Sequence, residues 1–145
     1  GITIADSKIE YMPGNGIYAH QCTFVIIVGN EIQFNAMRSA ELKNEGVAAA
    51  GITLYKPMDR GADKQSTTGL DYRVYIIRNQ IHHNHNEMLA WKLKSQPRTG
   101  PLDPHIGRYG AGIHIIDKDW IRDGEGRVLI ANNVIFWNGI GAIHT

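Results

Sequence analysis

The sequence predicts an all-β solenoid: a right-handed single-stranded parallel β-helix of about four coils with two long loop insertions. Three observations predict this fold. An aliphatic–Asn–aliphatic–aromatic pattern recurs along the chain, a second set of strand segments each begins with a glycine, and these segments show the period-two alternation of strands. A hydrophobic content of 43% suits a folded core and argues against disorder.

The recurring pattern aligns without gaps at four places in the chain. Aliphatic columns would fill the interior of stacked coils. Asparagine suits the bend between two strands, because it tolerates left-handed backbone geometry and can hydrogen-bond neighbouring backbone. Stacked asparagines can also bond to one another along the axis, so we expect an asparagine ladder. The aligned segments are Ile4–Tyr11, Ile27–Phe34, Ile76–His83 and Leu129–Phe136, with Ser7, Asn30, Asn79 and Asn132 in the asparagine column.

A glycine opens each strand of the second set, as a tight corner between coils would require. Alternation predicts which side chains of these strands point inward and which point outward. The segments are Gly16–His20, Gly51–Tyr55, Gly112–Ile115 and Gly141–His144. The predicted inward pairs are Ile17/Ala19, Ile52/Leu54 and Ile113/Ile115, and the predicted outward pairs are Tyr18/His20, Thr53/Tyr55 and His114/Ile116.

Two other architectures fit less well. A βαβ fold needs regular amphipathic helices between strands, and only 39–44 and 86–94 are short helix candidates. A β-sandwich would place hairpin turns between alternating runs. The Asn-Gly pairs at Asn15 and Asn138 recur at the same point of the repeat, which suits coil corners better. The insertions are expected at about 36–51 with 58–72, and at 85–109.

Composition and the chain ends narrow the class further. Both ends read as strand, so we expect residues 1–145 to be a single β-helix segment of a longer solenoid. A net charge of +1 without a basic stripe argues against a nucleic-acid partner, and no apolar run is long enough to span a bilayer. Cys22 is the only cysteine, which excludes an intrachain disulfide and suggests a small buried hydrophobe.

The repeats resemble the right-handed parallel β-helix proteins of the pectate-lyase-like superfamily, in particular bacterial β-helix repeat proteins of uncharacterised type. The resemblance is carried by 112–117, 128–139, 51–57 and 79–84. It implies a carbohydrate-handling protein that is secreted, periplasmic or on the cell surface. The superfamily also hosts adhesins and tailspikes, so the fold alone does not fix an activity. No catalytic set transfers, because the Trp-x-Asp-His, Asn-Thr-Asp, Asp-Asp and Gly-His-Gly elements of its best-known enzymes are absent here.

The glycine-led strands carry the candidate binding face. Insertions that emerge from coil corners can wall a groove on one face of a solenoid. Aromatic rings with hydrogen-bonding neighbours suit the stacking of sugars, although Tyr, Thr and His are also ordinary residues of a solvated sheet face. The candidate substrate-binding residues are Tyr18, His20, Thr53, Tyr55, Trp91 and His144.

Charged clusters follow two of these strands and supply the candidate catalytic residues. If the strands are adjacent, the clusters stack within about 4.8 Å. A lyase needs a base to take the proton α to a carboxylate, with calcium or arginine to stabilise the charge that develops, whereas a hydrolase uses two carboxylates. A charged, solvated turn is the simpler interpretation of either cluster. The candidate catalytic residues are Asp117, Asp119, Lys56, Asp59 and His114.

Two further motifs are interpreted structurally. The run His82-His83-Asn84-His85, completed by His105 or His114, has spacing that zinc could use, but His83 falls in the aromatic column and is expected to pack there. We therefore predict no metal site. The glycine-rich 107–112 precedes a strand, whereas a phosphate-binding loop follows one.

The sequence thus predicts a carbohydrate-active β-helix protein, a polysaccharide lyase or glycoside hydrolase acting on an acidic polysaccharide. The alternative is a non-catalytic carbohydrate-binding or structural segment of an adhesin, tailspike or surface protein. Calcium is the one cofactor that the lyase hypothesis suggests.

Overall fold

The computed structural model describes residues 1–22, 24–37, 49–57, 72–85, 110–116, 127–139 and 141–145. Within these ranges every regular element is a strand, which confirms the all-β prediction. The two expected helices, and most of both insertions, lie outside the described residues. The strands are β1 (Ile2–Ala5), β2 (Lys8–Glu10), β3 (Ile17–His20), β4 (Val25–Val28), β5 (Glu31–Gln33), β6 (Ala50–Tyr55), β7 (Val74–Ile77), β8 (Gln80–His82), β9 (Ala111–Ile116), β10 (Val128–Ala131), β11 (Val134–Phe136) and β12 (Ile143–His144).

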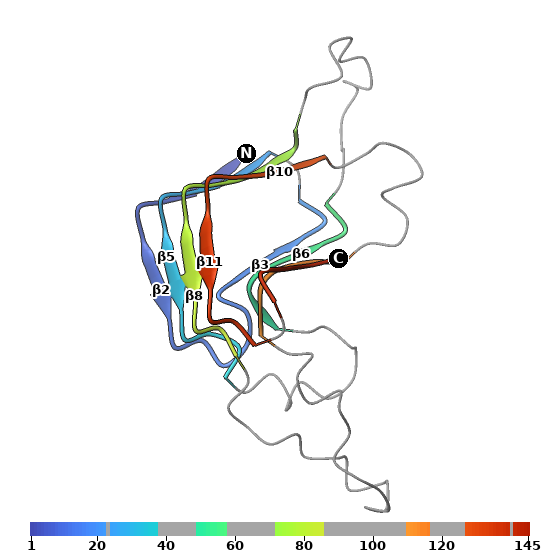
Figure 1. The fold of residues 1–145 in the computed structure, drawn as a ribbon. Helices are drawn as coiled ribbons and strands as arrows, with labels where there is room; N and C mark the ends of the chain where they lie inside the picture. The colour runs from blue at the N-terminus through green and yellow to red at the C-terminus, as the bar shows by residue number, and fades with distance from the viewer. Residues whose placement is uncertain (23, 38–48, 58–71, 86–109, 117–126, 140) are drawn as a thin grey trace, which may run out of the picture.

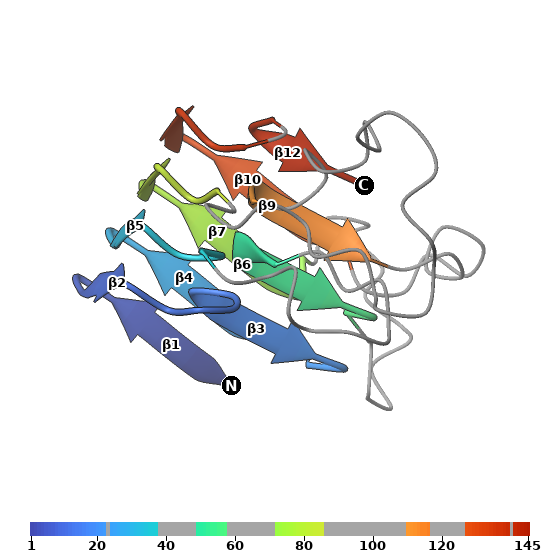
Figure 2. The ribbon, with the colours of Figure 1, turned by 90° about the horizontal axis from the view of Figure 1, so that it is seen from below.

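The strands form three all-parallel sheets of four strands each, ordered β1-β4-β7-β10, β2-β5-β8-β11 and β3-β6-β9-β12. The chain visits the three sheets in the same order each time, so β1, β2 and β3 form one pass and β4, β5 and β6 the next. Like strands of successive passes lie side by side (Figures 1 and 2). This arrangement is compatible with a parallel β-solenoid, the class that the repeats predicted.

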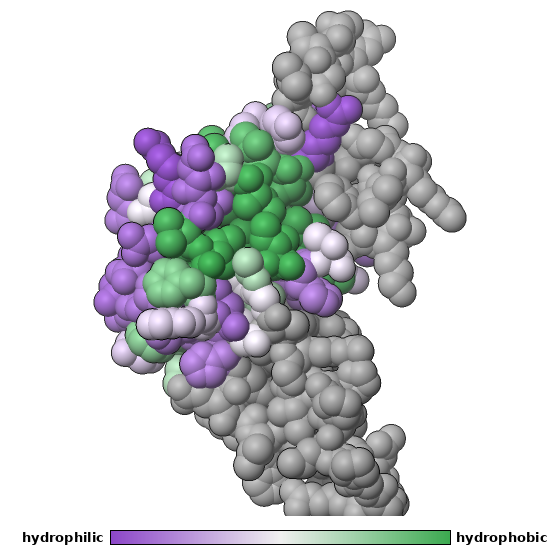
Figure 3. Space-filling view, in the orientation of Figure 1, coloured by the Kyte–Doolittle hydropathy of each residue, from purple (hydrophilic) through white to green (hydrophobic). Residues whose placement is uncertain are grey.

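The core consists of aliphatic rows that run from pass to pass. In the first two sheets, Ile27 pairs with Ile76 and Ile32 with Ile81, and all four side chains are fully buried. In the third sheet the predicted inward residues are buried in every case: Ile17, Ala19, Ile52, Leu54, Ile113 and Ile115. Apolar side chains gather inside the outline traced by the three sheets (Figure 3). Burial of these rows is the main force that stacks the passes.

The alignment of the fourth repeat was wrong by one residue. Ile130, not Leu129, pairs with Ile76, and Ile135, not Val134, pairs with Ile81. The asparagine that continues the ladder is therefore Asn133 and not Asn132. The physical reason is that the inward face must hold the aliphatic row. Only this register places Ile130 and Ile135 next to the isoleucines of the preceding pass.

The asparagine ladder exists, with a different local geometry from the one predicted. Asn30 donates its backbone N–H and its side-chain amide to Asn79 Oδ1 at 3.0 Å each, and Asn79 bonds Asn133 in the same way. The ladder asparagines are absent from the positive-φ residues, which instead include Asp6, Gly29, Arg78 and Asn132 just before the ladder positions. The asparagines are therefore selected for their side-chain bonds and not for backbone freedom.

A second ladder, which the sequence reasoning missed, lies at the next corner. Asn35 donates to Asn84 Oδ1, and Asn84 donates to Asn138 Oδ1, each through both the backbone N–H and the side-chain amide. Asn35 and Asn84 are fully buried. The signal was present, because each of these asparagines follows a first-ladder asparagine by five positions. Two ladders thus fix both ends of the β2-β5-β8-β11 sheet.

The glycine row serves close approach between passes and not a tight corner. A Cβ on Gly51 would lie 2.8 Å from the carbonyl oxygen of Gly112 and 2.9 Å from the side-chain nitrogen of Asn84. Gly112 lies in the same position one pass further on, and a Cβ on Gly112 would lie 2.7 Å from the carbonyl oxygen of Ala142. The register places Ala142, and not the predicted Gly141, in this row. Cys22 packs against the core, but it is half-buried and not buried as predicted.

Candidate functional site

The predicted binding residues that the structure describes gather on the outer face of the β3-β6-β9-β12 sheet. We call this surface the imidazole face. Pairing brings its residues into two neighbouring rows across successive passes. One row is Tyr18, Thr53, His114 and His144, and the other is His20, Tyr55 and Ile116.

Ring contacts tie these residues together. The His20 ring lies 6.1 Å from the Tyr18 ring and 5.0 Å from the Tyr55 ring, measured between centroids. His114 and His144 meet edge to face at 4.8 Å. Tyr18, His20 and His144 are exposed, so one part of this surface presents rings and ring nitrogens to solvent.

Two outward residues are nevertheless buried. Thr53 is fully buried, and its hydroxyl donates a hydrogen bond to Asn15 Oδ1, which also accepts the backbone N–H of Ala50. His114 is 7% exposed. Thr53 therefore fixes the start of the strand through Asn15, while the exposed rings beside it remain the accessible part of the face.

Lys56 stands at the edge of the imidazole face, in the left-handed conformation with φ of 49°. Its N–H donates to the carbonyl of Ile116 at 2.9 Å, and its ammonium lies 5.8 Å from the centroid of the Tyr55 ring. Lys56 and His114 are the candidate catalytic residues that the structure describes. The remaining candidates lie outside the described residues: Asp59, Asp117, Asp119 and the binding candidate Trp91.

The described carboxylates lie away from the imidazole face. Glu10 and Glu31 belong to the second sheet, and Asp6 belongs to the turn between β1 and β2. The described part of the imidazole face thus combines one ammonium group with three imidazoles and contains no carboxylate. At neutral pH, the charge of Lys56 is the one described feature of this face that would attract an anionic ligand.

A second cluster, which the sequence reasoning did not identify as a site, covers the outer side of the β2-β5-β8-β11 sheet and the residue after each strand. We call it the aromatic face. Its outward residues in chain order are Lys8, Glu10, Tyr11, Glu31, Gln33, Phe34, Gln80, His82, His83, Val134, Phe136 and Trp137.

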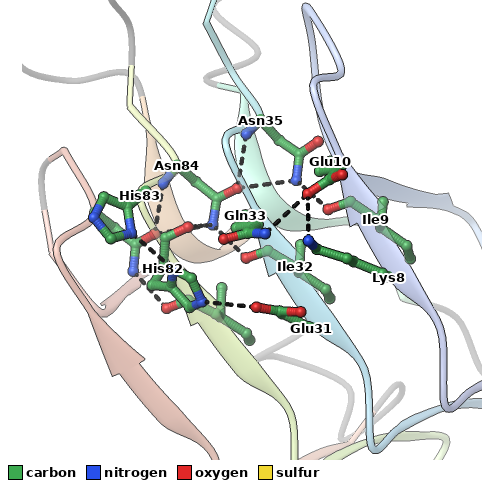
Figure 4. A network of polar contacts seen from close by, with 12 residues as sticks. Lys8, Ile9, Glu10, Glu31, Ile32, Gln33, Asn35, His82, His83 and Asn84 are labelled. Atoms are coloured by element: carbon green, nitrogen blue, oxygen red, sulfur yellow. Dashed lines mark hydrogen bonds and ion pairs between the residues drawn. The ribbon is translucent and has the colours of Figure 1, made fainter.

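Polar contacts connect the passes on the aromatic face (Figure 4). Glu10 accepts hydrogen bonds from Lys8 at 3.0 Å and from Gln33 at 2.9 Å. The hydrogen bond between Lys8 and Glu10 raises the pKa of Lys8 and lowers the pKa of Glu10. Both groups are solvated, so the pair organises the surface more than it stabilises the fold.

His82 and His83 share one hydrogen bond between their Nδ1 atoms, which lie 2.7 Å apart. One Nδ1 must donate and the other must accept, so at most one of the two imidazoles can be cationic in this arrangement. Glu31 Oε1 lies 3.6 Å from His82 Nε2. Burial and the neighbouring His83 lower the pKa of His82, against the opposing effect of Glu31.

Aromatic rings continue from pass to pass beside this polar strip. Tyr11 stacks on Phe34 at 5.5 Å, Phe34 lies 5.1 Å from His83, and His83 lies 5.0 Å from Trp137, all between ring centroids. His83 does pack in the aromatic column, as predicted. The fourth ring of that column is Trp137 and not Phe136, because of the one-residue shift of the last repeat.

The described residues offer neither a metal centre nor a membrane-spanning helix. No three His, Cys, Asp or Glu side chains among them converge in a way that could hold a metal ion. None of their elements is a helix of the length and apolarity needed to cross a membrane.

Comparison with protein-family models, with curated proteins and with solved structures found no match for this chain. The class of protein is therefore defined by the geometry of the described residues. They form three parallel sheets without helices, compatible with a parallel β-solenoid, and the sheets carry two chemically different outer faces.

Proposed function

We propose that this chain is a right-handed four-coil β-helix of the pectate-lyase-like type that binds an acidic polysaccharide along the imidazole face and cleaves it. The observation that carries the proposal is the placement of Lys56, His20 and His144 on one face from which every described carboxylate is absent. A polyanionic sugar chain is the ligand class that this charge and these exposed rings suit best.

The direction of the strand stacking supports an extended ligand. The two outward rows cross successive passes, which lie about 4.8 Å apart. Tyr18 and His20 on the first pass and His144 on the last are exposed, while Thr53 and His114 between them are buried. A ligand that reaches both groups of exposed rings must therefore span several passes. Tyr18 and His20, whose rings are exposed, supply the surface for stacking.

Among cleavage reactions, the described residues favour β-elimination. A lyase needs a base for the proton α to the sugar carboxylate, and an imidazole or a lysine can serve. Both catalytic candidates that the structure describes, His114 and Lys56, have that chemistry, but His114 is buried, so Lys56 at the edge of the face is the accessible one. A hydrolase needs two carboxylates. Its candidates are Asp59, Asp117 and Asp119, which lie outside the described residues.

A test of activity uses the full-length protein with pectin, alginate and glycosaminoglycans, each with added calcium and with chelator. We expect the ultraviolet absorbance of an unsaturated product to rise with at least one substrate. Release of reducing sugar without that absorbance would replace the lyase by a hydrolase. Binding without either product would leave the non-catalytic alternative, in which the chain is a binding segment of a surface protein. The proposal also implies a secreted, periplasmic or surface location.

A further inference from the structure

The outer face of the β1-β4-β7-β10 sheet is apolar, although the inner face of the same sheet already lines the core. Its outward residues form two rows that the register aligns from strand to strand. None of these residues is charged, whereas the outer sides of the other two sheets carry charged or histidine side chains. We call this surface the aliphatic face. Its rows are Thr3, Ile26, Tyr75 and Leu129, and Ala5, Val28, Ile77 and Ala131.

The two middle strands indicate that another apolar surface covers this face. A strand with water on one side alternates apolar and polar residues, whereas parallel strands covered on both sides are continuous apolar runs. β4 reads Val-Ile-Ile-Val and β7 reads Val-Tyr-Ile-Ile. Both strands are paired on either side, so their outward side chains are not at an edge of the sheet. Ile26 of β4 is nevertheless 39% exposed, because the other two described sheets lie on the inner side of this one (Figure 1).

The sizes of the outward side chains make the aliphatic face complementary to itself. The outward residues of β1 are the small Thr3 and Ala5, and the residues at the same positions of β7 are the large Tyr75 and Ile77. A two-fold axis that runs along β4, between two copies, would exchange β1 and β7. The large side chains of each copy would then face the small side chains of the other, and the two Ile26 side chains would meet on the axis.

The charges at the adjoining corner have the same symmetry. Asp6 follows β1, Gly29 follows β4 and Arg78 follows β7, and backbone hydrogen bonds between the passes align these three residues in one row. The same two-fold axis passes beside the uncharged Gly29. It would bring Asp6 of each copy opposite Arg78 of the other, and opposite charges across an interface favour one orientation over others.

We propose that the aliphatic face docks on the same face of a second copy of this chain, in an isologous dimer with its two-fold axis along β4. Two sheets that pack face to face lie about 10 Å apart, which lets outward side chains of both copies interdigitate. The contact is smaller than the interface of a permanent dimer, so monomer and dimer should interconvert with concentration. The aliphatic face shares no residue with the imidazole face, so this dimer is independent of the proposed cleavage.

The first test is sedimentation velocity of the full chain over a wide range of concentrations. We expect the unaltered chain to shift from monomer to dimer as its concentration rises. Ile26→Lys would place two ammonium groups together on the axis and should weaken association about tenfold or more. Gln80→Lys is the matched control, because it adds the same charge at an exposed position of the neighbouring sheet, and it should leave association unchanged. Melting temperatures show which variants fold, and Ile26→Thr replaces Ile26→Lys if the latter does not.

The second test addresses the orientation of the two copies. Asp6→Arg and Arg78→Asp each place like charges opposite one another and should weaken the dimer about threefold. The double variant restores opposite charges, so its association should return toward that of the unaltered chain.

Three results would overturn the proposal. The chain could stay monomeric at every concentration, and sedimentation of that monomer with phospholipid vesicles would then assign the aliphatic face to a lipid surface. A folded Ile26 variant could associate as tightly as Gln80→Lys, which would place the contact elsewhere. The double charge variant could associate no better than the two single variants, which would exclude a two-fold axis along β4.

Discussion

The imidazole face and the aromatic face are built by the same passes and differ in chemistry. The imidazole face presents Lys56 and the exposed imidazoles of His20 and His144, while the aromatic face presents a ring row beside Glu10 and Glu31. Behind both faces the inward rows are nearly uniform isoleucine. Uniform inward rows stack the passes by themselves, so the outward rows are free to carry two unrelated surfaces. In this fold, stability and recognition use alternate residues of the same strands.

The prediction with the largest expected effect concerns the corner that joins the two faces. Asn84 Oδ1 accepts the backbone N–H and the side-chain amide of Asn35, and its own amide donates to the carbonyl oxygens of Ile32 and His82. Asn84→Ala leaves several of these buried groups without partners, at about 1–3 kcal/mol for each. We expect the free energy of unfolding to fall by about 3 kcal/mol or more, measured by urea denaturation.

The control for this variant is Asn132→Gly, which removes an exposed asparagine whose φ of 56° glycine adopts readily. Its stability should stay within about 0.5 kcal/mol of the unaltered chain. Equal losses in the two variants would mean that the second ladder contributes nothing specific, and that the two faces are held together by the aliphatic rows alone.

A smaller effect is expected from the glycine row under the imidazole face. In Gly51→Ala the new Cβ would meet the Gly112 carbonyl oxygen at 2.8 Å and the Ile81 side chain at 2.8 Å, so adjacent passes must move apart. We expect a loss of about 1–3 kcal/mol. Gly141→Ala is the matched control, because its Cβ would have no neighbour within 4 Å. Thermal unfolding of both variants checks the prediction, and similar melting temperatures would contradict it.

These buried contacts also show how far the sequence could be read. The aliphatic rows were predictable because each pass repeats a branched aliphatic at the same inward column. The register of the last pass was not predictable, because adjacent residues there have the same type of side chain. Leu129 and Ile130 both fit the core, and Asn132 and Asn133 both fit the ladder. Only the pairing with the preceding strand, which places Ile130 against Ile76, shows which of the two registers the chain adopts.

The faces were predictable to different degrees. Alternation correctly predicted that Tyr18 and His20 point outward, because a strand with one buried face alternates apolar and polar residues. It could not show that Thr53 is covered and bonded to Asn15, because that bond joins residues of different passes. The aromatic face was read as a packing column, since exposure is not visible in a pattern of ring-bearing residues. The second ladder was missed because the aligned eight-residue segments stopped one residue before Asn35 and Asn84 and two residues before Asn138.

Lys56→Gln tests the charge difference between the faces. Lys56 is half-buried at the edge of the imidazole face, so its charge contributes modestly to attracting a polyanion. We expect affinity for an acidic polysaccharide to fall about threefold at low salt and the difference to shrink as salt is added. Binding of a neutral polysaccharide should not change. Titration calorimetry at two salt concentrations measures both effects, and an equal loss for the neutral polysaccharide would show that Lys56 does not act through its charge.

The smallest expected effect is a pH dependence that belongs to the aromatic face. Burial and His83 lower the pKa of His82 in the folded chain, while Glu31 partly opposes them and Lys8 adds to them. The unfolded state therefore binds more protons than the folded state in the window just below the ordinary histidine pKa. Stability from this group must rise with pH through that window and fall as the pH is lowered.

His82→Phe removes the titrating group and keeps a ring to stack on Phe136. The unfolding free energy of this variant should depend less on pH than that of the unaltered chain within the same window. Proton NMR titration of the unaltered chain should place the His82 pKa below the ordinary histidine value, because burial and the neighbouring His83 disfavour the charged form. A His82 pKa at or above the ordinary value would show that Glu31 outweighs burial, and the pH slope of stability would then reverse.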